Sequence, residues 1–236
     1  MLFVRILITL SLCIMLHASI EPLRYDRVFL VDKINNTYLF RGNMPTHANG
    51  TFAEELLKHY LRKAALEKSG VELPEEYELI DITLLNPSLA DEIDGLNVER
   101  AFFKQNPNKG KLIHYPFVGD NNNPKNITDP QERYKLSITL PSWQKDLLYF
   151  RLRFLHNQMK TASKSTVFYF HCGHGQDRTG ELSATYEMQF MNKSYNTVMD
   201  FNIKLGMDVP ENINAVDWYC EYLQNGKSYK TTKCQQ

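Results

Sequence analysis

Residues 166–190 decide the fold of this chain, and they read TVFYFHCGHGQDRTGELSATYEMQF. The first part, Val167 to Phe170, is an unbroken apolar and aromatic run, which is typical of a central strand covered on both faces. A polar segment with glycines follows, and apolar residues then recur at helical spacing from Leu182 onward. The polar segment is therefore expected at the carboxyl end of a buried strand, where open α/β sheets place their ligand sites.

Strand-like and helix-like runs alternate along the rest of the chain. Strands are expected at residues 37–41, 77–83, 111–117 and 166–171, and helices at 52–68, 142–162, 180–192, 194–205 and 212–223. This alternation predicts an α/β domain with a largely parallel central sheet flanked by helices. The segment 119–130, which is rich in asparagine and proline, is expected to be a mobile loop.

The length and charge of the chain limit its function. A chain of 236 residues has room for one ordinary catalytic domain. Basic residues (Lys and Arg) and acidic residues (Asp and Glu) number 27 each, so no overall field attracts nucleic acid or an acidic membrane surface. Any binding of anions must therefore be local, and no nucleic-acid partner is expected.

The amino terminus has the pattern of a secretory signal. Arg5 precedes an apolar run from Ile6 to Leu16, and the small residues Ala18 and Ser19 follow it. The run is too short to cross a bilayer of about 30 Å. We therefore expect a signal peptide at residues 1–19, one domain at residues 20–236, no membrane span, and a secreted or lumenal protein. An uncleaved anchor or a buried strand is the alternative interpretation of residues 1–19.

Two further features agree with a secretory route. Asn-x-Ser/Thr triplets predict a glycoprotein with acceptors at Asn35, Asn49, Asn126 and Asn192. Of the four cysteines, Cys13 lies in the signal peptide and Cys172 lies in the segment discussed below. The remaining two, Cys220 and Cys234, are expected to form a disulfide, with two free thiols as the alternative.

The segment at residues 171–180 combines groups that bind and attack a phosphate. Cys172 supplies a thiolate, and Gly173 and Gly175 permit the tight curl that turns backbone N–H groups toward an anion. The helix that begins near Thr179 adds the positive end of its dipole. Arg178 can hold two phosphate oxygens at once. These surroundings should lower the pKa of Cys172 below the free value of about 8.5, which makes the thiol a nucleophile at neutral pH.

These residues resemble the His-Cys-x5-Arg-Ser/Thr signature of the protein tyrosine and dual-specificity phosphatase superfamily, in a variant form that ends Asp-Arg-Thr-Gly. The resemblance implies a dual-specificity-phosphatase-like fold, in which Cys172 attacks phosphorus, His171 supports the nucleophile and Thr179 helps the thiolate to leave. It also implies a set of residues that bind the substrate phosphate, namely Gly173, His174, Gly175, Gln176, Asp177 and Arg178.

A general acid is needed to protonate the leaving oxygen. The segment Tyr115-Pro116-Phe117 resembles the one that precedes the general-acid aspartate in the phosphatase-and-tensin group. That resemblance implies that Asp120 is the general acid. Asp177, inside the loop, is the second candidate and Asp129 the third, and the plain alternative is that Asp120 only caps a turn.

The resemblance implies dephosphorylation of phosphotyrosine, and also of phosphoserine or phosphothreonine, in a protein or peptide substrate, with no cofactor and no metal. Asp177 motivates a second interpretation, a phosphoinositide or inositol-phosphate phosphatase. An inactive phosphate-binding module and a relative of rhodanese or arsenate reductase are further alternatives. A zinc site made by Cys172 with His171 and His174 would need a second cluster of ligands, and none is visible in the sequence.

Overall fold

The computed structural model describes residues 21–226 and Cys234, so the predicted signal peptide at 1–19 lies outside the described residues. One sheet has the strand order β1-β2-β5-β3-β4. The strands are β1 (Phe29–Ile34), β2 (Thr37–Asn43), β3 (Glu78–Thr83), β4 (Gly110–His114) and β5 (Thr166–Cys172). All neighbouring pairs are parallel except β1 with β2, which form an antiparallel pair at one edge. The predicted α/β fold with a largely parallel sheet is confirmed.

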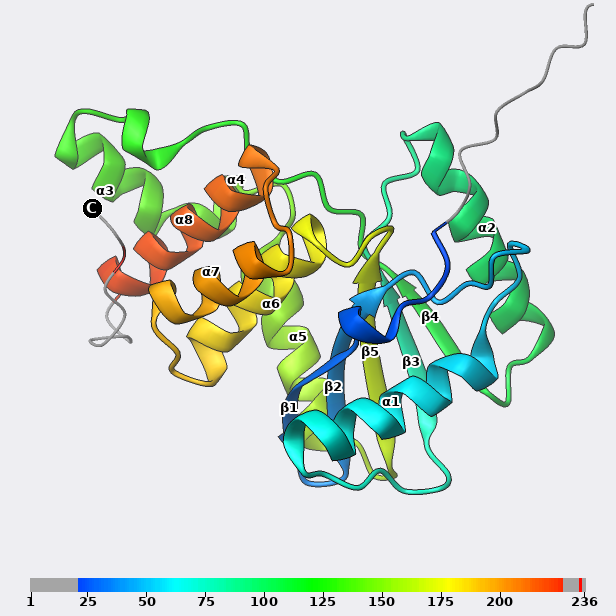
Figure 1. The fold of residues 1–236 in the computed structure, drawn as a ribbon. Helices are drawn as coiled ribbons and strands as arrows, with labels where there is room; N and C mark the ends of the chain where they lie inside the picture. Colours follow the sequence, from blue (N-terminus) through cyan, green and yellow to red (C-terminus); the bar gives the residue numbers. More distant parts are fainter. Residues whose placement is uncertain (1–20, 227–233, 235–236) are drawn as a thin grey trace, which may run out of the picture.

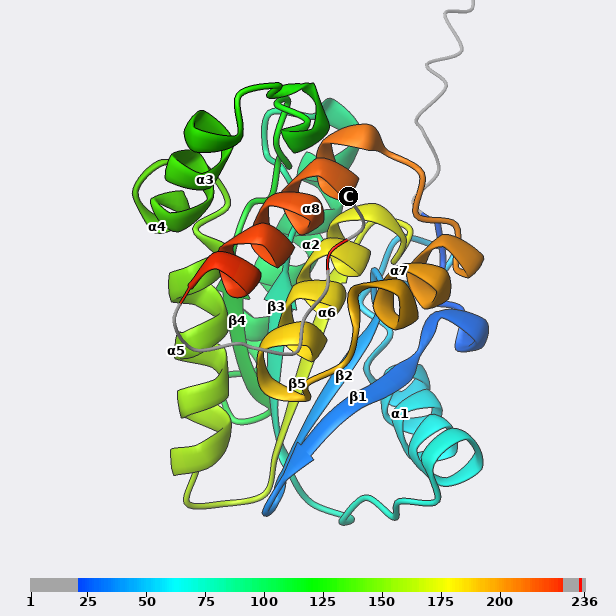
Figure 2. The same cartoon turned by 90° about the vertical axis from the view of Figure 1, so that its left-hand side faces the viewer.

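Helices cover both faces of this sheet, as Figures 1 and 2 show. Helices α1 (Glu54–Ser69) and α2 (Ala90–Gln105) lie on one side. The other side carries α3 (Pro130–Ile138), α4 (Leu140–Trp143), α5 (Leu148–Thr161), α6 (Asp177–Phe190), α7 (Tyr195–Lys204) and α8 (Pro210–Asn225). Short 3-10 turns occur at Tyr25–Arg27 and Pro124–Asn126.

Strand β5 is buried on both faces, as its apolar run predicts. Val167 and Tyr169 belong to the core cluster that contains α1, whereas Phe168 and Phe170 belong to the cluster that contains α5, α6 and α8. Successive side chains of a strand point to opposite faces, so this division follows from the pleat. The strand ends at Cys172, and α6 begins at Asp177. The polar segment between them therefore lies at the carboxyl edge of the sheet.

Three elements were not predicted from the sequence: β1, α2 and α3. The helix expected over 142–162 was wrong at its start, because α5 begins at Leu148 and a separate turn of helix, α4, precedes it. Leu147 has a φ of 51°, and this left-handed conformation cannot continue a right-handed helix. The strand expected over 111–117 is shorter, since β4 ends at His114.

Hydrogen bonds join the segment 119–130, which was expected to be a mobile loop, to α8. Asn214 Nδ2 donates a hydrogen bond to the Asp120 carbonyl oxygen at 3.0 Å, and Trp218 Nε1 donates to the Asn122 carbonyl oxygen at 2.8 Å. These bonds give partners to two backbone carbonyl groups of the segment.

The cysteines and acceptor asparagines lie as follows. A disulfide joins Cys220 in α8 to Cys234, and Cys172 has a free, buried thiol. The four predicted glycosylation acceptors, Asn35, Asn49, Asn126 and Asn192, are all exposed. Across residues 21–226, no helix combines the length and apolar character that crossing a membrane requires.

Candidate active site

The loop between β5 and α6 makes a tight turn that passes close to the backbone of β2. Gly175 has a φ of 70°, and a Cβ atom at this residue would lie 2.6 Å from the Gly42 carbonyl oxygen. Both the left-handed conformation and this close approach require glycine. Gly173 has no such constraint, because a Cβ there would meet nothing nearer than 3.8 Å. The loop therefore depends on one of its two glycines for its shape.

Cys172 lies at the base of this loop with 2% of its surface exposed. Its backbone N–H donates to Thr179 Oγ1 at 2.9 Å, and the same hydroxyl lies 3.3 Å from the Cys172 sulfur. Burial alone would raise the pKa of the thiol, but the positive charge of Arg178 and hydrogen bonds from Thr179 outweigh burial and lower it. The thiolate is therefore favoured at a lower pH than in a free cysteine.

Arg178 is held by an acidic residue that the sequence did not indicate. Both terminal nitrogens of its guanidinium pair with the carboxylate of Glu92, near the start of α2. A backbone N–H, that of Asn86, donates to Glu92 Oε2 at 2.6 Å and fixes the carboxylate. A guanidinium has one edge formed by its two terminal nitrogens and another formed by Nε and a terminal nitrogen. The pairing with Glu92 uses the first edge, so the Nε edge is left for two oxygens of a phosphate. Glu92 was missed because α2 was not predicted.

A second arginine, in β2, holds the loop in place. Arg41 in β2 is fully buried, and its Nη2 donates to the Gly175 carbonyl oxygen at 3.1 Å. Its Nη1 bonds to the side-chain oxygen of Asn202 in α7. Burial lowers the pKa of Arg41 to about 10. The guanidinium therefore ties the loop to two neighbouring elements.

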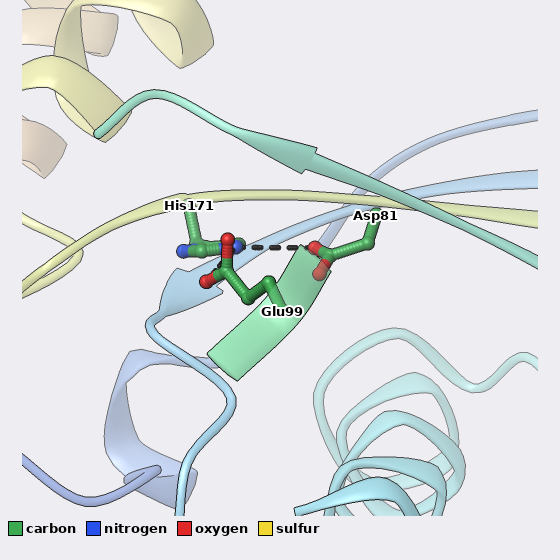
Figure 3. A group of neighbouring side chains, drawn as sticks. All are labelled: Asp81, Glu99 and His171. Atoms are coloured by element: carbon green, nitrogen blue, oxygen red, sulfur yellow. Dashed lines mark ion pairs between the residues drawn. The ribbon is translucent and has the colours of Figure 1, made fainter. Parts of the chain in front are cut away.

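The two histidines of the loop have different surroundings. His174 is exposed, and its Nε2 lies 3.9 Å from a Glu21 carboxylate oxygen. His171 is fully buried, with Nε2 at 3.1 Å from Asp81 Oδ1 and 3.3 Å from Glu99 Oε1 (Figure 3). Its other nitrogen, Nδ1, lies 3.3 Å from the Cys172 carbonyl oxygen. Neither ring nitrogen of His171 therefore turns to the Cys172 sulfur, so the arrangement does not fit a zinc site made with His174.

Among the described residues, Asp81, Glu99 and His171 are the one group of three side chains whose polar atoms lie close enough to share an ion. Nε2 of His171 lies within ion-pair distance of both carboxyl groups, so these two acids are the partners of the imidazole when it is protonated.

Asp120, the first candidate for the general acid, is buried at the end of the segment that follows β4. Its backbone N–H donates to the Glu211 carbonyl oxygen at 2.8 Å, and its Oδ1 accepts from the Asn122 N–H at 2.9 Å. Burial raises the pKa of Asp120, which favours the protonated form that a proton donor needs.

The peptide groups just before Asp120 are fixed by another buried acid. Val118 N and Gly119 N donate to the two carboxylate oxygens of Asp146, at 2.9 and 2.6 Å. Asp146 is in turn next to Glu181 in α6, and burial raises the pKa of Glu181 well above its usual value. This contact connects the Asp120 segment to the helix that follows the Cys172 loop.

Asp177 and Asp129, the other candidates for the acid, both bond to backbone groups. The N–H groups of Asp208 and Val209 donate to Asp177 Oδ1 at 2.9 and 3.0 Å, just before α8 begins. Asp129 caps α3 by accepting from the Gln131 N–H at 2.9 Å. All three candidates, Asp120 included, thus accept hydrogen bonds from nearby backbone N–H groups, and the choice of Asp120 as the proton donor stays a prediction.

Gly173 and Gln176 contact their neighbours through the backbone, and Gln176 Nε2 also donates to the Leu205 carbonyl oxygen at 3.4 Å. The Gly173 carbonyl oxygen accepts from the Met44 N–H at 3.2 Å, and the Gln176 carbonyl oxygen accepts from the Gly180 N–H at 2.7 Å. Gln176 precedes the first residue of α6. The loop thus begins and ends on fixed backbone bonds, with the positive end of α6 behind it.

No protein-family model matches this chain, and a search of curated proteins found no match. Among solved structures, Tk-PTP in the active form has a TM-score of 0.43 with 10% identity over 82% of this chain and 95% of that chain. TpbA of P. aeruginosa has a TM-score of 0.40, with 14% identity over 81% and 87% of the two chains.

A third structure is the core catalytic domain of the PP-IP phosphatase SIW14 from S. cerevisiae. It has a TM-score of 0.40 and 18% identity, and the match covers 85% of this chain and 88% of that chain.

Proposed function

We propose that this protein is a cysteine-dependent phosphoester hydrolase. One observation carries the proposal: the Cys172 thiol, with its lowered pKa, lies at the start of a curled loop that ends at Arg178 and Thr179. A nucleophile, a guanidinium that can hold an anion and a helix N-terminus are thereby placed around one small space. Such a set of groups suits attack on a phosphate dianion.

In the first step, the Cys172 thiolate attacks phosphorus, so that an S–P bond forms while the ester P–O bond breaks. Asp120 gives its proton to the departing oxygen, which leaves as an alcohol or a phenol. The Nε edge of Arg178 and the loop N–H groups hold the phosphate oxygens as charge builds up on them. Glu92 keeps the guanidinium in place for that contact.

In the second step, a water molecule attacks the phosphocysteine. The water gives a proton to the Asp120 carboxylate, the S–P bond breaks, and inorganic phosphate leaves. The Thr179 hydroxyl, 3.3 Å from the sulfur, stabilises the thiolate as it departs. Asp120 is thereby protonated again for the next cycle.

We infer that phosphotyrosine in a protein or peptide is the preferred substrate, with phosphoserine and phosphothreonine as secondary ones. Arg178 is the only arginine or lysine in the loop 172–180, which suits one phosphate group. A polyphosphorylated inositol or lipid would need further cations. The Asp177 carboxylate, which motivates that alternative, accepts hydrogen bonds from Asp208 and Val209 instead.

Secretion is also a proposal. It is supported by the disulfide between Cys220 and Cys234 and by the exposed acceptor asparagines. In secretory cells we expect the protein to migrate faster after treatment with an N-glycosidase. Unchanged migration and a reduced Cys220 would contradict this route.

The proposed function is tested by phosphate release from three panels: phosphotyrosine peptides, phosphoserine and phosphothreonine peptides, and inositol phosphates with phosphoinositides. We expect the fastest release from phosphotyrosine and none in the Cys172→Ser variant. Release that persists in Cys172→Ser would contradict the thiolate mechanism. Binding of phosphopeptide without release by the reduced protein would favour a binding module, and a preference for the third panel would change the substrate class.

A further inference from the structure

A group of three ionisable side chains lies inside the protein, directly behind the nucleophile. Asp81 is in the middle of β3, Glu99 is in α2, and His171 is the residue before Cys172 in β5. Figure 3 shows the two carboxyl groups turned toward the imidazole. All three side chains are fully buried. Charged groups are costly in such a place unless they are paired, so the arrangement calls for an explanation.

The contacts of His171 favour a proton on each ring nitrogen. Asp81 Oδ1 lies 3.1 Å from Nε2, and the Cys172 carbonyl oxygen lies 3.3 Å from Nδ1. A carbonyl oxygen and an ionised carboxylate oxygen only accept hydrogen bonds, so these contacts favour the form of His171 in which both nitrogens carry a hydrogen. Burial alone would lower the pKa of His171, but the carboxylates of Glu99 and Asp81 raise it to about 9. The imidazole is therefore an imidazolium at neutral pH.

The two carboxyl groups share one cation. Within residues 21–226, the only ion pairs of Asp81 and Glu99 are those with His171. Burial raises the pKa of Glu99 to about 8; His171 opposes this rise and Asp81 adds to it. The two acids thus compete for the single positive charge that His171 can supply.

We propose that Asp81 and Glu99 are positioning residues for Cys172: they keep His171 doubly protonated, and its Nδ1–H then holds the Cys172 carbonyl group. The nucleophile is the next residue along the chain, so a fixed peptide group fixes the direction of its side chain. The inference rests on the proposed function for its importance to activity, but the protonation of His171 can be measured without a substrate.

Other ionisable groups lie around this cluster. Arg100 of α2 acts to lower the pKa of Glu99, and the two acids act to raise the pKa of Tyr169 in β5, which Arg41 of β2 opposes. The ring of Tyr169 stacks on His171 with centroids 5.5 Å apart. Burial raises the pKa of Tyr169 well above its usual value, so it remains neutral over the range in which His171 titrates.

The first experiment is a titration of the wild-type protein with ¹⁵N-labelled histidine, followed by NMR. The His171→Gln variant identifies the signals of His171 among those of the seven histidines. We expect both ring nitrogens of His171 to be protonated at neutral pH and to lose a proton only near pH 9. A neutral His171 at pH 7 would overturn the inference. This measurement does not depend on any variant being able to fold.

The second experiment compares Asp81→Asn and Glu99→Gln with a matched control, Glu54→Gln. Glu54 is a buried carboxylate in α1 that pairs with Lys58 and Lys109 and does not contact the loop. We expect Asp81→Asn to make His171 lose its proton at a lower pH and to reduce kcat/KM by about tenfold to a hundredfold. The control Glu54→Gln should change neither the pH at which His171 loses its proton nor kcat/KM. Wild-type activity in Asp81→Asn, with a neutral His171, would overturn the inference.

The Glu99→Gln variant tests the second carboxyl group of the cluster. It removes one of the two acids that raise the pKa of His171, so we expect the alkaline loss of activity that comes from this cluster to move to lower pH. If activity falls at the same high pH in Glu99→Gln and in the wild type, the role of Glu99 is contradicted.

The inference and the proposed function can fail separately. If the wild-type protein holds an imidazolium at His171 but releases no phosphate from any panel, the proposed function fails and the inferred protonation of His171 holds. A neutral His171 in an active phosphatase overturns the inference alone.

Discussion

The hydroxyl of Thr179 lies 3.3 Å from the sulfur of Cys172 and also accepts a hydrogen bond from the Cys172 N–H at 2.9 Å. Thr179 is in the first turn of α6, whereas Cys172 ends β5. One side chain thus joins the two ends of the loop and contacts the nucleophile. The hydroxyl hydrogen points either to the sulfur or to the Gly42 carbonyl oxygen, which is 3.4 Å away.

Replacing Thr179 with alanine should slow the breakdown of the phosphocysteine. A hydrogen bond to a charged group contributes about 1.5–3 kcal/mol, which corresponds to about tenfold to a hundredfold in rate. Rapid-quench kinetics should show accumulation of the intermediate in Thr179→Ala. Thr179→Ser keeps the hydroxyl and should behave like the wild type. Equal turnover of the alanine variant and the wild type would show that the contact has no role in the reaction.

Glu92→Gln should weaken the hold on Arg178 while preserving the shape of the side chain. The amide cannot neutralise the guanidinium, and breaking a buried ion pair costs about 3–5 kcal/mol. We expect kcat/KM to fall by about tenfold or more, because Arg178 is free to turn away from the phosphate. Glu54→Gln removes a similarly buried carboxylate from α1 and should lower stability without this kinetic effect. A normal kcat/KM in Glu92→Gln would be evidence against the assigned role.

Asp120→Asn and Asp177→Asn should separate the two candidates for the general acid. Burial raises the pKa of Asp120, so its proton is present at low pH and is lost as the pH rises through that raised value. Activity that depends on this proton falls over the same range, and Asp120→Asn should lack that fall. We expect Asp120→Asn to lose about a hundredfold or more on alkyl phosphates, and much less on nitrophenyl phosphate, whose leaving group needs no proton.

Asp177→Asn should retain most of its activity, because an amide oxygen can still accept from the Asp208 and Val209 N–H groups. A pH–rate profile for each variant, measured on both types of phosphate, provides the test. If Asp177→Asn, and not Asp120→Asn, shows the loss that depends on the leaving group, the assignment of the two residues must be exchanged.

The two glycines of the loop should respond differently to alanine. In Gly175→Ala, the new methyl group would lie 2.6 Å from the Gly42 carbonyl oxygen, at a residue with a φ of 70°. We expect a loss of about 1–3 kcal/mol in the free energy of unfolding, together with loss of activity. Gly173→Ala has no contact nearer than 3.8 Å and should keep its stability. Urea unfolding of both variants checks this, and equal stability would contradict the account of the loop.

The sequence predicted the strands and helices whose apolar residues follow a simple pattern. The apolar run of β5 and the helical spacing after it placed Cys172, Arg178 and Thr179 correctly around one loop. Residues that reach the site from distant elements were not predictable in this way. Glu92 and Glu99 both lie on α2, whose sequence contains Gly95 and lacks a side-chain cap at its start. Asp81 was inside a predicted strand, but nothing local shows that it faces His171 across the sheet.

The central claim is that Cys172 forms a covalent bond to phosphorus during turnover. Acid quenching during hydrolysis of a phosphotyrosine peptide by the Thr179→Ala variant, followed by peptide mass spectrometry, tests it most directly. The account predicts a phosphoryl group on the peptide that contains Cys172, and its absence in a protein that also carries Cys172→Ser. Phosphate release from the peptide substrate with no phosphoryl group ever found on Cys172 would contradict the account.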